Sequence, residues 1–153
     1  MTGDGDVVVR GSDREALPSA VSGEVQSAPS SRCIVGLIDD DPAVRRALVR
    51  LLVASGYAAA PFASAEEFLS WGRTHTLCCL ILDVELSRMS GPELYGYLLA
   101  SGEDLPVIFI SAVADAASLI RLHTGVVAEV LSKPIDGDHL CDVIARALVR
   151  SAV

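Results

Sequence analysis

The chain reads CIVGLIDDDP at residues 33–42, and this stretch decides the fold. Its apolar half is almost continuous, as in a strand that is covered on both faces, and it ends in three acids and a proline. Asp41 and Pro42 predict a helix that starts at once, with the aspartate as N-cap and the proline in the first turn. The stretch therefore predicts a buried parallel strand, an acidic strand end and a helix in direct succession.

The same alternation of strand and helix recurs along the rest of the chain. Further apolar runs, expected as strands, lie at residues 57–61, 77–82, 106–110 and 126–131. Apolar stripes with helical spacing run through residues 44–52 and 140–148, and glycines at 56, 102 and 125 stand where helices should end. Five strand–helix units with right-handed crossovers predict an α/β fold, with one parallel five-stranded sheet between two layers of helices.

Two further features of the helices can be read from the sequence. Residues 64–67 and 90–93 have the pattern of capping boxes, in which a serine and a glutamate three positions later bond to the start of a helix. Arg45, Arg46 and Arg50 are expected on the solvated face of the first helix. The chain lacks the GxGxxG pattern of dinucleotide-binding folds, which disfavours that version of an α/β sheet.

Length and composition restrict the class of protein further. The chain has 153 residues, 51% of them apolar, and a net charge of −8, which suits one domain with a tail. Residues 1–31 are rich in Gly, Ser, Asp, Ala and Pro and predict a disordered N-terminal tail, so that the domain spans residues 32–151. No apolar run approaches the ~20 residues that cross a bilayer, and the acidic balance argues against a protein that wraps a DNA duplex.

The cysteines and the N-terminus bear on the compartment. Cys33, Cys78, Cys79 and Cys141 have neither the spacing of a zinc site nor that of a secreted disulfide framework. We expect all four to be reduced and to act as small hydrophobic residues. The N-terminus has no secretory signal pattern, so the sequence predicts a cytoplasmic protein without a membrane partner.

Polar side chains follow four of the five predicted strands at the point where each strand ends. They are Asp39–Asp41 after the first, Asp83 after the third, Ser111 after the fourth and Lys133 after the fifth. Carboxyl ends of parallel strands meet at one edge of a sheet, so these groups should lie together. The second strand has no such group, which suits a strand at the sheet margin in the order 2-1-3-4-5.

This set of side chains predicts a magnesium site that receives a phosphoryl group. Carboxylates without His or Cys suit a hard ion, Mg²⁺ with Mn²⁺ as an alternative. Lys133 is the only lysine among 12 basic residues, and its ammonium can approach a phosphoryl oxygen as a point charge. The bond from Lys133 to Pro134 is a candidate cis peptide.

With these residues in this order, residues 32–149 resemble the receiver domain of two-component response regulators. The phrases SAEEFL at 64–69 and MSG at 89–91 resemble in particular the receivers of nitrogen-fixation and nodulation regulators. The resemblance implies a flavodoxin-like (βα)5 fold. It also implies a role for each site residue: Asp83 as phosphoacceptor, Asp39, Asp40 and the backbone carbonyl of Glu85 as further metal ligands beside Asp83, and Ser111 and Lys133 as partners of the phosphoryl group.

The resemblance also implies how such a domain works. The phosphoryl donor would be a sensor histidine kinase or a histidine phosphotransfer protein, and the domain would phosphorylate and dephosphorylate itself without independent turnover. Few residues follow Leu148, so we expect a stand-alone receiver that signals through protein contacts and does not bind DNA directly. A homodimer through the last two helices stays an open alternative.

Three departures from the family pattern leave other functions open. Ser87 stands where the family usually has proline, Arg88 where it often has an acid, and Val130 where it usually has an aromatic residue. These departures would suit a constitutive protein-interaction module. A Mg²⁺-dependent phosphohydrolase is a third hypothesis, which the sequence disfavours because Pro42 and Ala43 follow the acids and no later acidic pair is found.

Overall fold

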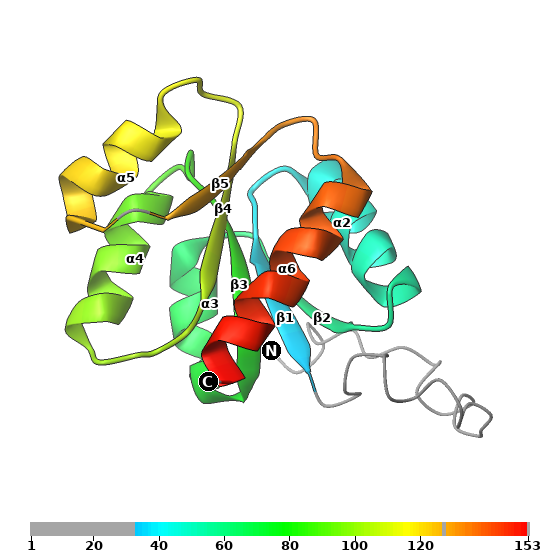
Figure 1. Cartoon of the computed structure of the whole chain (residues 1–153). Coiled ribbons are helices and arrows are strands. Elements are labelled where there is room, and N and C mark those ends of the chain that lie inside the picture. The colour runs from blue at the N-terminus through cyan, green and yellow to red at the C-terminus, as the bar shows by residue number, and fades with distance from the viewer. Residues whose placement is uncertain (1–32, 127, 153) are drawn as a thin grey trace.

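The computed structural model describes residues 33–126 and 128–152, and in this part of the chain all strands belong to one parallel sheet (Figure 1). The strand order is β2-β1-β3-β4-β5, as the sequence predicted. The strands are β1 (Ile34–Ile38), β2 (Ala58–Phe62), β3 (Leu77–Asp83), β4 (Val107–Ser111) and β5 (Glu129–Ser132). The helices are α2 (Pro42–Ala54), α3 (Ala65–Trp71), α4 (Gly91–Ala100), α5 (Ala116–Thr124) and α6 (Gly137–Ala152), with a 3-10 turn, η3, at Thr74–Thr76. The predicted tail, residues 1–31, lies outside the described residues.

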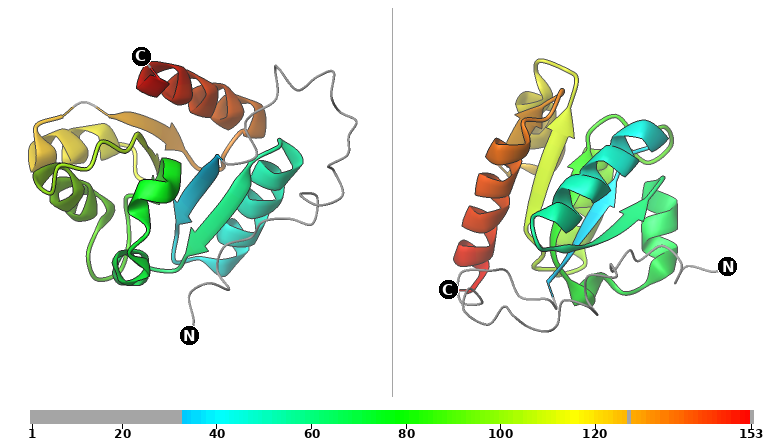
Figure 2. Two further views of the ribbon diagram at one scale, coloured as in Figure 1. Left: turned by 90° about the horizontal axis from the view of Figure 1, so that it is seen from below. Right: turned by 90° about the vertical axis from the view of Figure 1, so that its right-hand side faces the viewer.

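Helices α2 and α6 cover one face of the sheet, and both predicted apolar stripes are used there (Figures 1 and 2). Leu48 and Leu52 of α2 and Leu140 and Ile144 of α6 are buried against β1, β3 and β4. Burying a leucine or isoleucine side chain stabilises the fold by roughly 1.5–3 kcal/mol, so this layer holds the central strands firmly.

The other three helices, α3, α4 and α5, pack on the opposite face of the sheet. Their buried residues surround Phe62, Phe68 and Phe109, which are all at most 1% exposed. Phe62 and Phe68 meet edge to face with ring centroids 5.3 Å apart. Since both faces of β1, β3 and β4 are covered, their nearly continuous apolar sequences are explained.

The helix ends follow the predicted chemistry with one difference. Asp41 caps α2 and Ser90 forms the complete capping box of α4. Ser64 accepts a hydrogen bond from the Glu67 amide, as predicted, but the Glu67 carboxylate accepts from the amide of Ala63 instead of the cap residue. This hydrogen bond fixes Ala63, between β2 and α3, to the first turn of α3.

The prediction of four reduced cysteines is wrong, because Cys33 and Cys78 form a disulfide. The register of β1 against β3 shifts at this point, with Ile34 opposite Leu77 but Val35 opposite Cys79. Cys78 is therefore an extra residue in the ladder, and its side chain packs on the α2 and α6 face together with Cys33 and Cys79. A regular strand would have turned Cys78 to the other face, which is why alternation alone did not reveal the pair.

Candidate functional site

The end of β1 supplies two carboxylates in different environments. Asp39 follows the strand directly and is fully buried, and its Oδ1 accepts a hydrogen bond of 2.9 Å from the amide of Asp41. Asp40 is exposed to solvent at the start of the turn into α2. The third acid of the run, Asp41, is used as the helix cap, with its Oδ1 2.9 Å from the amide of Ala43. The run of three therefore divides into two site residues and one structural residue.

The neighbouring strands deliver the other predicted residues to the same edge. Asp83 and Ser111 are the last residues of β3 and β4, and they are 2% and 1% exposed. Lys133 follows β5, and its amide donates to the carbonyl of Ser111 at 2.9 Å. The bond between Lys133 and Pro134 is cis, as predicted. Segments that are far apart in the sequence thus meet because parallel strands end at one edge.

The ammonium of Lys133 lies between the two buried carboxylates. Its Nζ is 2.9 Å from Oδ2 of Asp39 and 3.4 Å from Oδ2 of Asp83. Both contacts are ion pairs between the ammonium and a buried carboxylate, and the contact with Asp83 also has hydrogen-bond geometry. Among the described residues, Oδ2 of Asp39 has no other polar partner than this ammonium.

The protonation of this cluster is set by burial and by crowding of charge. Burial raises the pKa of Asp83 to about 7, and the charges of Asp39 and Glu85 raise it too, while the Glu85 amide and Lys133 act in the opposite direction. Burial alone would lower the pKa of Lys133, but the contacts with Asp39 and Asp83 outweigh it, so that the pKa is raised. The lysine is therefore held as a cation beside an acid that gives up its proton reluctantly.

Ser111 has a partner that the sequence did not predict. Its hydroxyl donates to Oε2 of Glu85 at 2.6 Å, and Oε1 of Glu85 accepts a weaker bond of 3.4 Å from the Ala112 amide. The Ser111 oxygen in turn accepts from the Val113 amide at 2.9 Å. Glu85 was predicted to contribute only its backbone carbonyl, and that role stays a prediction. Nothing in the sequence around Glu85 signals the side-chain contact, because it depends on the path of the loop after β3.

The expectation that Arg45 lies on a solvated helix face is wrong. Its Nη1 donates to the backbone carbonyl of Asp39 at 2.8 Å, and the side chain is half-buried. Arg46 and Arg50 are exposed, as predicted. Arg45 sits six positions after Asp39, so it reaches back from the second turn of α2 and holds the strand end whose carboxylate enters the site.

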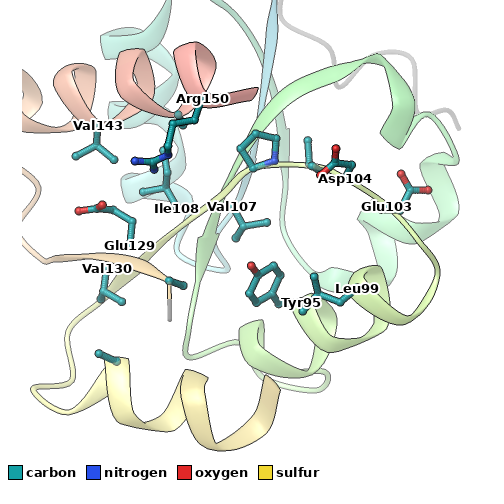
Figure 3. Close-up of a pocket in the computed structure, with 15 residues that line it drawn as sticks. Tyr95, Leu99, Glu103, Asp104, Val107, Ile108, Glu129, Val130, Val143 and Arg150 are labelled. Carbon is teal, nitrogen blue, oxygen red and sulfur yellow. The ribbon is translucent and has the colours of Figure 1, made fainter. Parts of the chain in front are cut away.

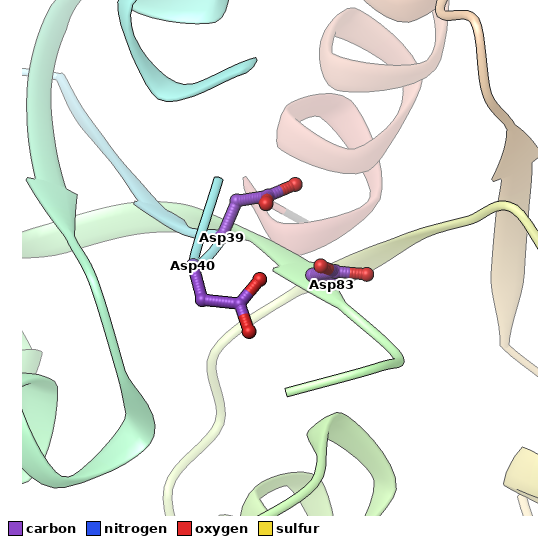
Figure 4. Close-up of side chains that lie close together, drawn as sticks. All are labelled: Asp39, Asp40 and Asp83. Atoms are coloured by element: carbon purple, nitrogen blue, oxygen red, sulfur yellow. The ribbon is translucent and has the colours of Figure 1, made fainter. Parts of the chain in front are cut away.

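The three aspartates can hold a metal ion. One oxygen each of Asp39, Asp40 and Asp83 lies within 4.8 Å of the others (Figure 4), and within the described residues this is the one cluster of three potential ligand side chains. All donors are carboxylate oxygens, the ligands that Mg²⁺ prefers.

A groove of about 950 Å³ lies away from this cluster (Figure 3). Its lining includes Val107 and Ile108 at the start of β4, Glu129 and Val130 of β5, and Tyr95 of α4. The groove thus lies at the amino ends of β4 and β5, whereas the aspartates lie at the carboxyl ends of β1 and β3. The acidic cluster is therefore a separate, charged site at the opposite edge of the sheet.

The family is shown by comparison with known proteins. Residues 35–145 match the family described as "Response regulator receiver domain". The chain belongs to this family, whose general function is to accept a phosphoryl group in two-component signalling. Receiver domains generally bind Mg²⁺ at an acidic pocket and interact with histidine kinases, and this chain has a cluster of three acids, Asp39, Asp40 and Asp83, that can hold a metal ion.

Curated relatives agree with the resemblance to nodulation and nitrogen-fixation regulators. Nodulation protein W of Bradyrhizobium diazoefficiens is 32% identical over 121 residues, which cover 79% of this chain and 53% of that protein. The transcriptional regulatory protein FixJ of Azorhizobium caulinodans is 35% identical over 118 residues, which cover 77% of this chain and 56% of FixJ. The chain spans about half the length of these curated relatives.

Solved structures agree on the fold. The response regulator StyR superposes with a TM-score of 0.72 at 34% identity, over 79% of this chain and 61% of StyR. A receiver domain protein from Clostridium thermocellum superposes with a TM-score of 0.70 over 78% of this chain and 97% of its own length; at 22% identity it supports the fold alone. Among the described residues, no helix combines the length and apolar character needed to cross a membrane.

Proposed function

We propose that Asp83 accepts a phosphoryl group from a phosphohistidine, on a sensor histidine kinase or a histidine phosphotransfer protein. The observation that carries the proposal is the position of the only lysine, with its Nζ 2.9 Å from Asp39 and 3.4 Å from Asp83. A cation held between two buried acids can pair with phosphoryl oxygens once the phosphoryl group arrives. In this proposal the receiver domain spans residues 32–151 and works in the cytoplasm.

The residues around Asp83 have separate roles in the proposal. Asp83 is the nucleophile: one carboxylate oxygen forms a bond to phosphorus while the bond from phosphorus to the donor breaks. Lys133 pairs with one phosphoryl oxygen. The Ser111 hydroxyl turns from Glu85 to a second oxygen, which requires that its 2.6 Å bond to Glu85 is released. Water attacking the resulting acyl phosphate resets the domain.

The acids beside Asp83 fit a bound divalent cation. Asp39, Asp40 and Asp83, together with the backbone carbonyl of Glu85, would hold Mg²⁺. When bound, Mg²⁺ supplies positive charge that neutralises the acids and the charge on the phosphoryl oxygens. Asp83, with its pKa raised to about 7, needs such neutralisation to be fully ionised at neutral pH.

The output in this proposal is a contact with another protein. The loop after β4 carries Ala112 and Val113, both exposed, and its backbone is tied to Ser111 and Glu85 by the hydrogen bonds of the site. Movement of Ser111 would release those bonds and reshape the loop, which changes the surface offered to a partner. We expect one phosphate per chain and no independent turnover of small phosphate esters.

The test is phosphorylation of the full chain by acetyl phosphate with Mg²⁺, followed by intact mass. We expect one added phosphate that hydroxylamine removes, as for an acyl phosphate, and none after Asp83→Asn. Asp104→Asn is the matched control, since Asp104 is an exposed acid outside the cluster. Calorimetry should also show Mg²⁺ binding that Asp40→Asn weakens.

Three outcomes would contradict the proposal. An adduct that survives Asp83→Asn would place the phosphate on another residue. Partner binding that is equal with and without phosphodonor, in a chain that takes up no phosphate, would favour the constitutive interaction module. Catalytic turnover of a small ester would favour the phosphohydrolase.

A further inference from the structure

The disulfide joins β1 and β3 at the edge of the sheet that lies opposite the aspartates. Cys33 directly precedes β1 and Cys78 is the second residue of β3; their Cα atoms are 5.6 Å apart, and their sequence separation is 45. The other ends of the same two strands carry Asp39 and Asp83. One pair of neighbouring strands thus holds a covalent link at one end and the phosphoacceptor site at the other.

The local backbone is built to bring the two sulfurs together. The register shift after Ile34 makes Cys78 an extra residue in the β1–β3 ladder and turns its side chain to the α2 and α6 face, where Cys33 also packs. Leu77 and Leu80 pack on the opposite face. Cys79 follows directly and points to the Cys33 face as well, but it is fully buried in the core and unpaired.

The two halves of the disulfide differ in access. Cys33 is 8% exposed, whereas Cys78 is half-buried. An incoming thiolate therefore has its easier approach at the Cys78 residue. Cys79 is closed to such chemistry, because burial raises the pKa of its thiol to about 12 and it has no exposed surface.

We propose that Cys33 and Cys78 are a reversible redox-modification site, whose reaction partners are dithiols and disulfides of the thiol pool. The inference uses the cytoplasmic location proposed above, because disulfides in that compartment are usually transient or redox-sensing. It does not depend on phosphorylation of Asp83.

The exchange is balanced with two electrons and two protons. A thiolate of the dithiol attacks the Cys78 sulfur, the bond between the two cysteine sulfurs breaks, and the Cys33 sulfur leaves and takes a proton. The second thiolate of the dithiol then attacks the dithiol's first sulfur, which is bonded to Cys78 in the mixed disulfide. The Cys78 sulfur leaves and takes a proton. The chain gains two thiols, and the dithiol becomes a disulfide.

Exchange at this site changes the stability of the receiver domain. The disulfide closes a loop that contains β1, α2, β2 and α3, and it restrains the unfolded chain over that whole stretch. A loop of this length predicts that the oxidised chain melts about 10 °C higher than the reduced chain. The thiol pool would thereby set how much folded receiver is present, whatever the state of Asp83.

The experiment is a redox titration of the full chain in mixtures of reduced and oxidised glutathione with catalytic thioredoxin-type dithiol. Thiols are counted after quenching and denaturation. The four cysteines should give four thiols in reducing mixtures and two in oxidising mixtures, with one transition between them. The melting temperature should rise by about 10 °C across the same transition.

Variants assign the transition to the pair. Cys78→Ser should show three thiols in every mixture and a constant melting temperature. Cys141→Ser, the matched control, should keep the transition with one thiol fewer at each end. Because the wild-type titration needs no variant, a Cys78→Ser chain that fails to fold does not weaken the test.

Three results would overturn the inference: four thiols in every mixture, two thiols even in excess dithiol, or a disulfide that joins two chains by mass. Phosphorylation by acetyl phosphate, measured on both redox forms, separates this inference from the proposed function. A chain that titrates as described but takes up no phosphate would contradict only the latter.

Discussion

The two edges of the sheet differ in what β1 and β3 carry: buried charged groups at the carboxyl edge, and a disulfide with apolar packing at the amino edge. At the carboxyl edge, Asp39 and Asp83 are buried beside Lys133, so that charge is removed from water. At the amino edge, the same strands β1 and β3 are tied by the Cys33–Cys78 disulfide and by apolar packing. The carboxyl edge therefore carries the reactive groups, and the amino edge stabilises the two strands that position them.

The difference between the edges shows where this fold can bury a carboxylate at a cost in stability. A buried carboxylate loses hydration that one ion pair only partly replaces, and the raised pKa of Asp83 reports that deficit. The packed layers on both faces of the sheet and the disulfide stabilise the strands that position it. We therefore expect substitutions at the carboxyl edge to show pH dependence, and substitutions at the amino edge to show none.

The largest effect should come from Lys133→Met, which removes the cation between two buried acids. With EDTA present and at pH 8, where Asp83 is ionised, we expect the free energy of unfolding to fall by ~3 kcal/mol. At pH 5 the loss should be smaller, because Asp83 then carries a proton. Urea unfolding at both values of pH measures the difference, and a loss that is the same at pH 5 and pH 8 would contradict the role of charge.

The next effect compares Gly91, at the carboxyl edge, with Gly36, in the middle of β1. A Cβ at Gly91 would lie 2.3 Å from the backbone oxygen of Asp83 and 3.0 Å from the Cα of Val84, whereas a Cβ at Gly36 would meet side-chain atoms of Leu77 at 2.7 Å. Leucine can move and backbone cannot, so we expect Gly91→Ala to lose ~2–3 kcal/mol of unfolding free energy and Gly36→Ala ~1 kcal/mol.

Gly96→Ala is the control for that comparison. Gly96 lies within α4, the helix that Gly91 begins, and nothing lies within 4 Å of its added Cβ. We expect this substitution to stabilise the chain by ~0.5–1 kcal/mol, through helix propensity alone. If Gly91→Ala behaved like Gly96→Ala in thermal or urea unfolding, the close approach of α4 to the end of β3 would be refuted.

The sequence predicted the carboxyl edge well because its signals are local. Each strand is predicted by an apolar run, and four of the five runs are followed within two residues by a polar residue of the site: Asp39, Asp83, Ser111 or Lys133. Parallel topology then brings them to one edge without any knowledge of side-chain contacts. The second strand has no polar site residue after it, which predicted its place at the margin of the sheet, and the structure confirms that strand order.

The sequence failed where the answer depends on register or on loop geometry. The register shift that pairs Cys78 with Cys33 is a property of two strands together, and period-two alternation within one strand does not encode it. Likewise, the contacts of Arg45 with Asp39 and of Glu85 with Ser111 depend on how a helix and a loop return to the site.

A smaller effect should follow from removing the charge of Asp83. Folding raises the pKa of this acid from 3.8 to about 7, so the folded state binds its proton more tightly than the unfolded state does. Stability therefore falls as pH rises between about 4 and about 7. Without divalent cations, we expect Asp83→Asn to gain ~2 kcal/mol of unfolding free energy at pH 8 and less than half of that at pH 5.

Asp104→Asn controls for net charge in that experiment, since Asp104 is exposed and outside the cluster. Unfolding by urea in EDTA at pH 5, 6, 7 and 8 gives the profile for each chain. Parallel profiles for wild type and Asp83→Asn would mean that Asp83 titrates as a solvent-exposed acid does. The comparison of edges would then lose its main support, because burial at the carboxyl edge would carry no electrostatic consequence.

The smallest effect concerns Glu85, whose carboxylate accepts from the Ser111 hydroxyl at 2.6 Å and from the Ala112 amide at 3.4 Å. These donors face the position that phosphoryl oxygens would take in the proposed reaction, and a negative charge there opposes an incoming anion. Coulomb repulsion of ~1 kcal/mol between partly solvated charges predicts that Glu85→Gln is phosphorylated by acetyl phosphate roughly three- to tenfold faster.

Two further variants separate the causes of that acceleration. Glu103→Gln removes the same charge at an exposed position away from the cluster, so an equal acceleration there would reduce the effect to net charge. Glu85→Ala removes the acceptor of Ser111 as well as the charge. If the Ser111 hydroxyl must leave Glu85 before it reaches the phosphoryl group, acetyl phosphate should phosphorylate Glu85→Ala faster than Glu85→Gln. Equal rates would mean that the charge of Glu85, and not its hydrogen bond with Ser111, limits the reaction at the carboxyl edge.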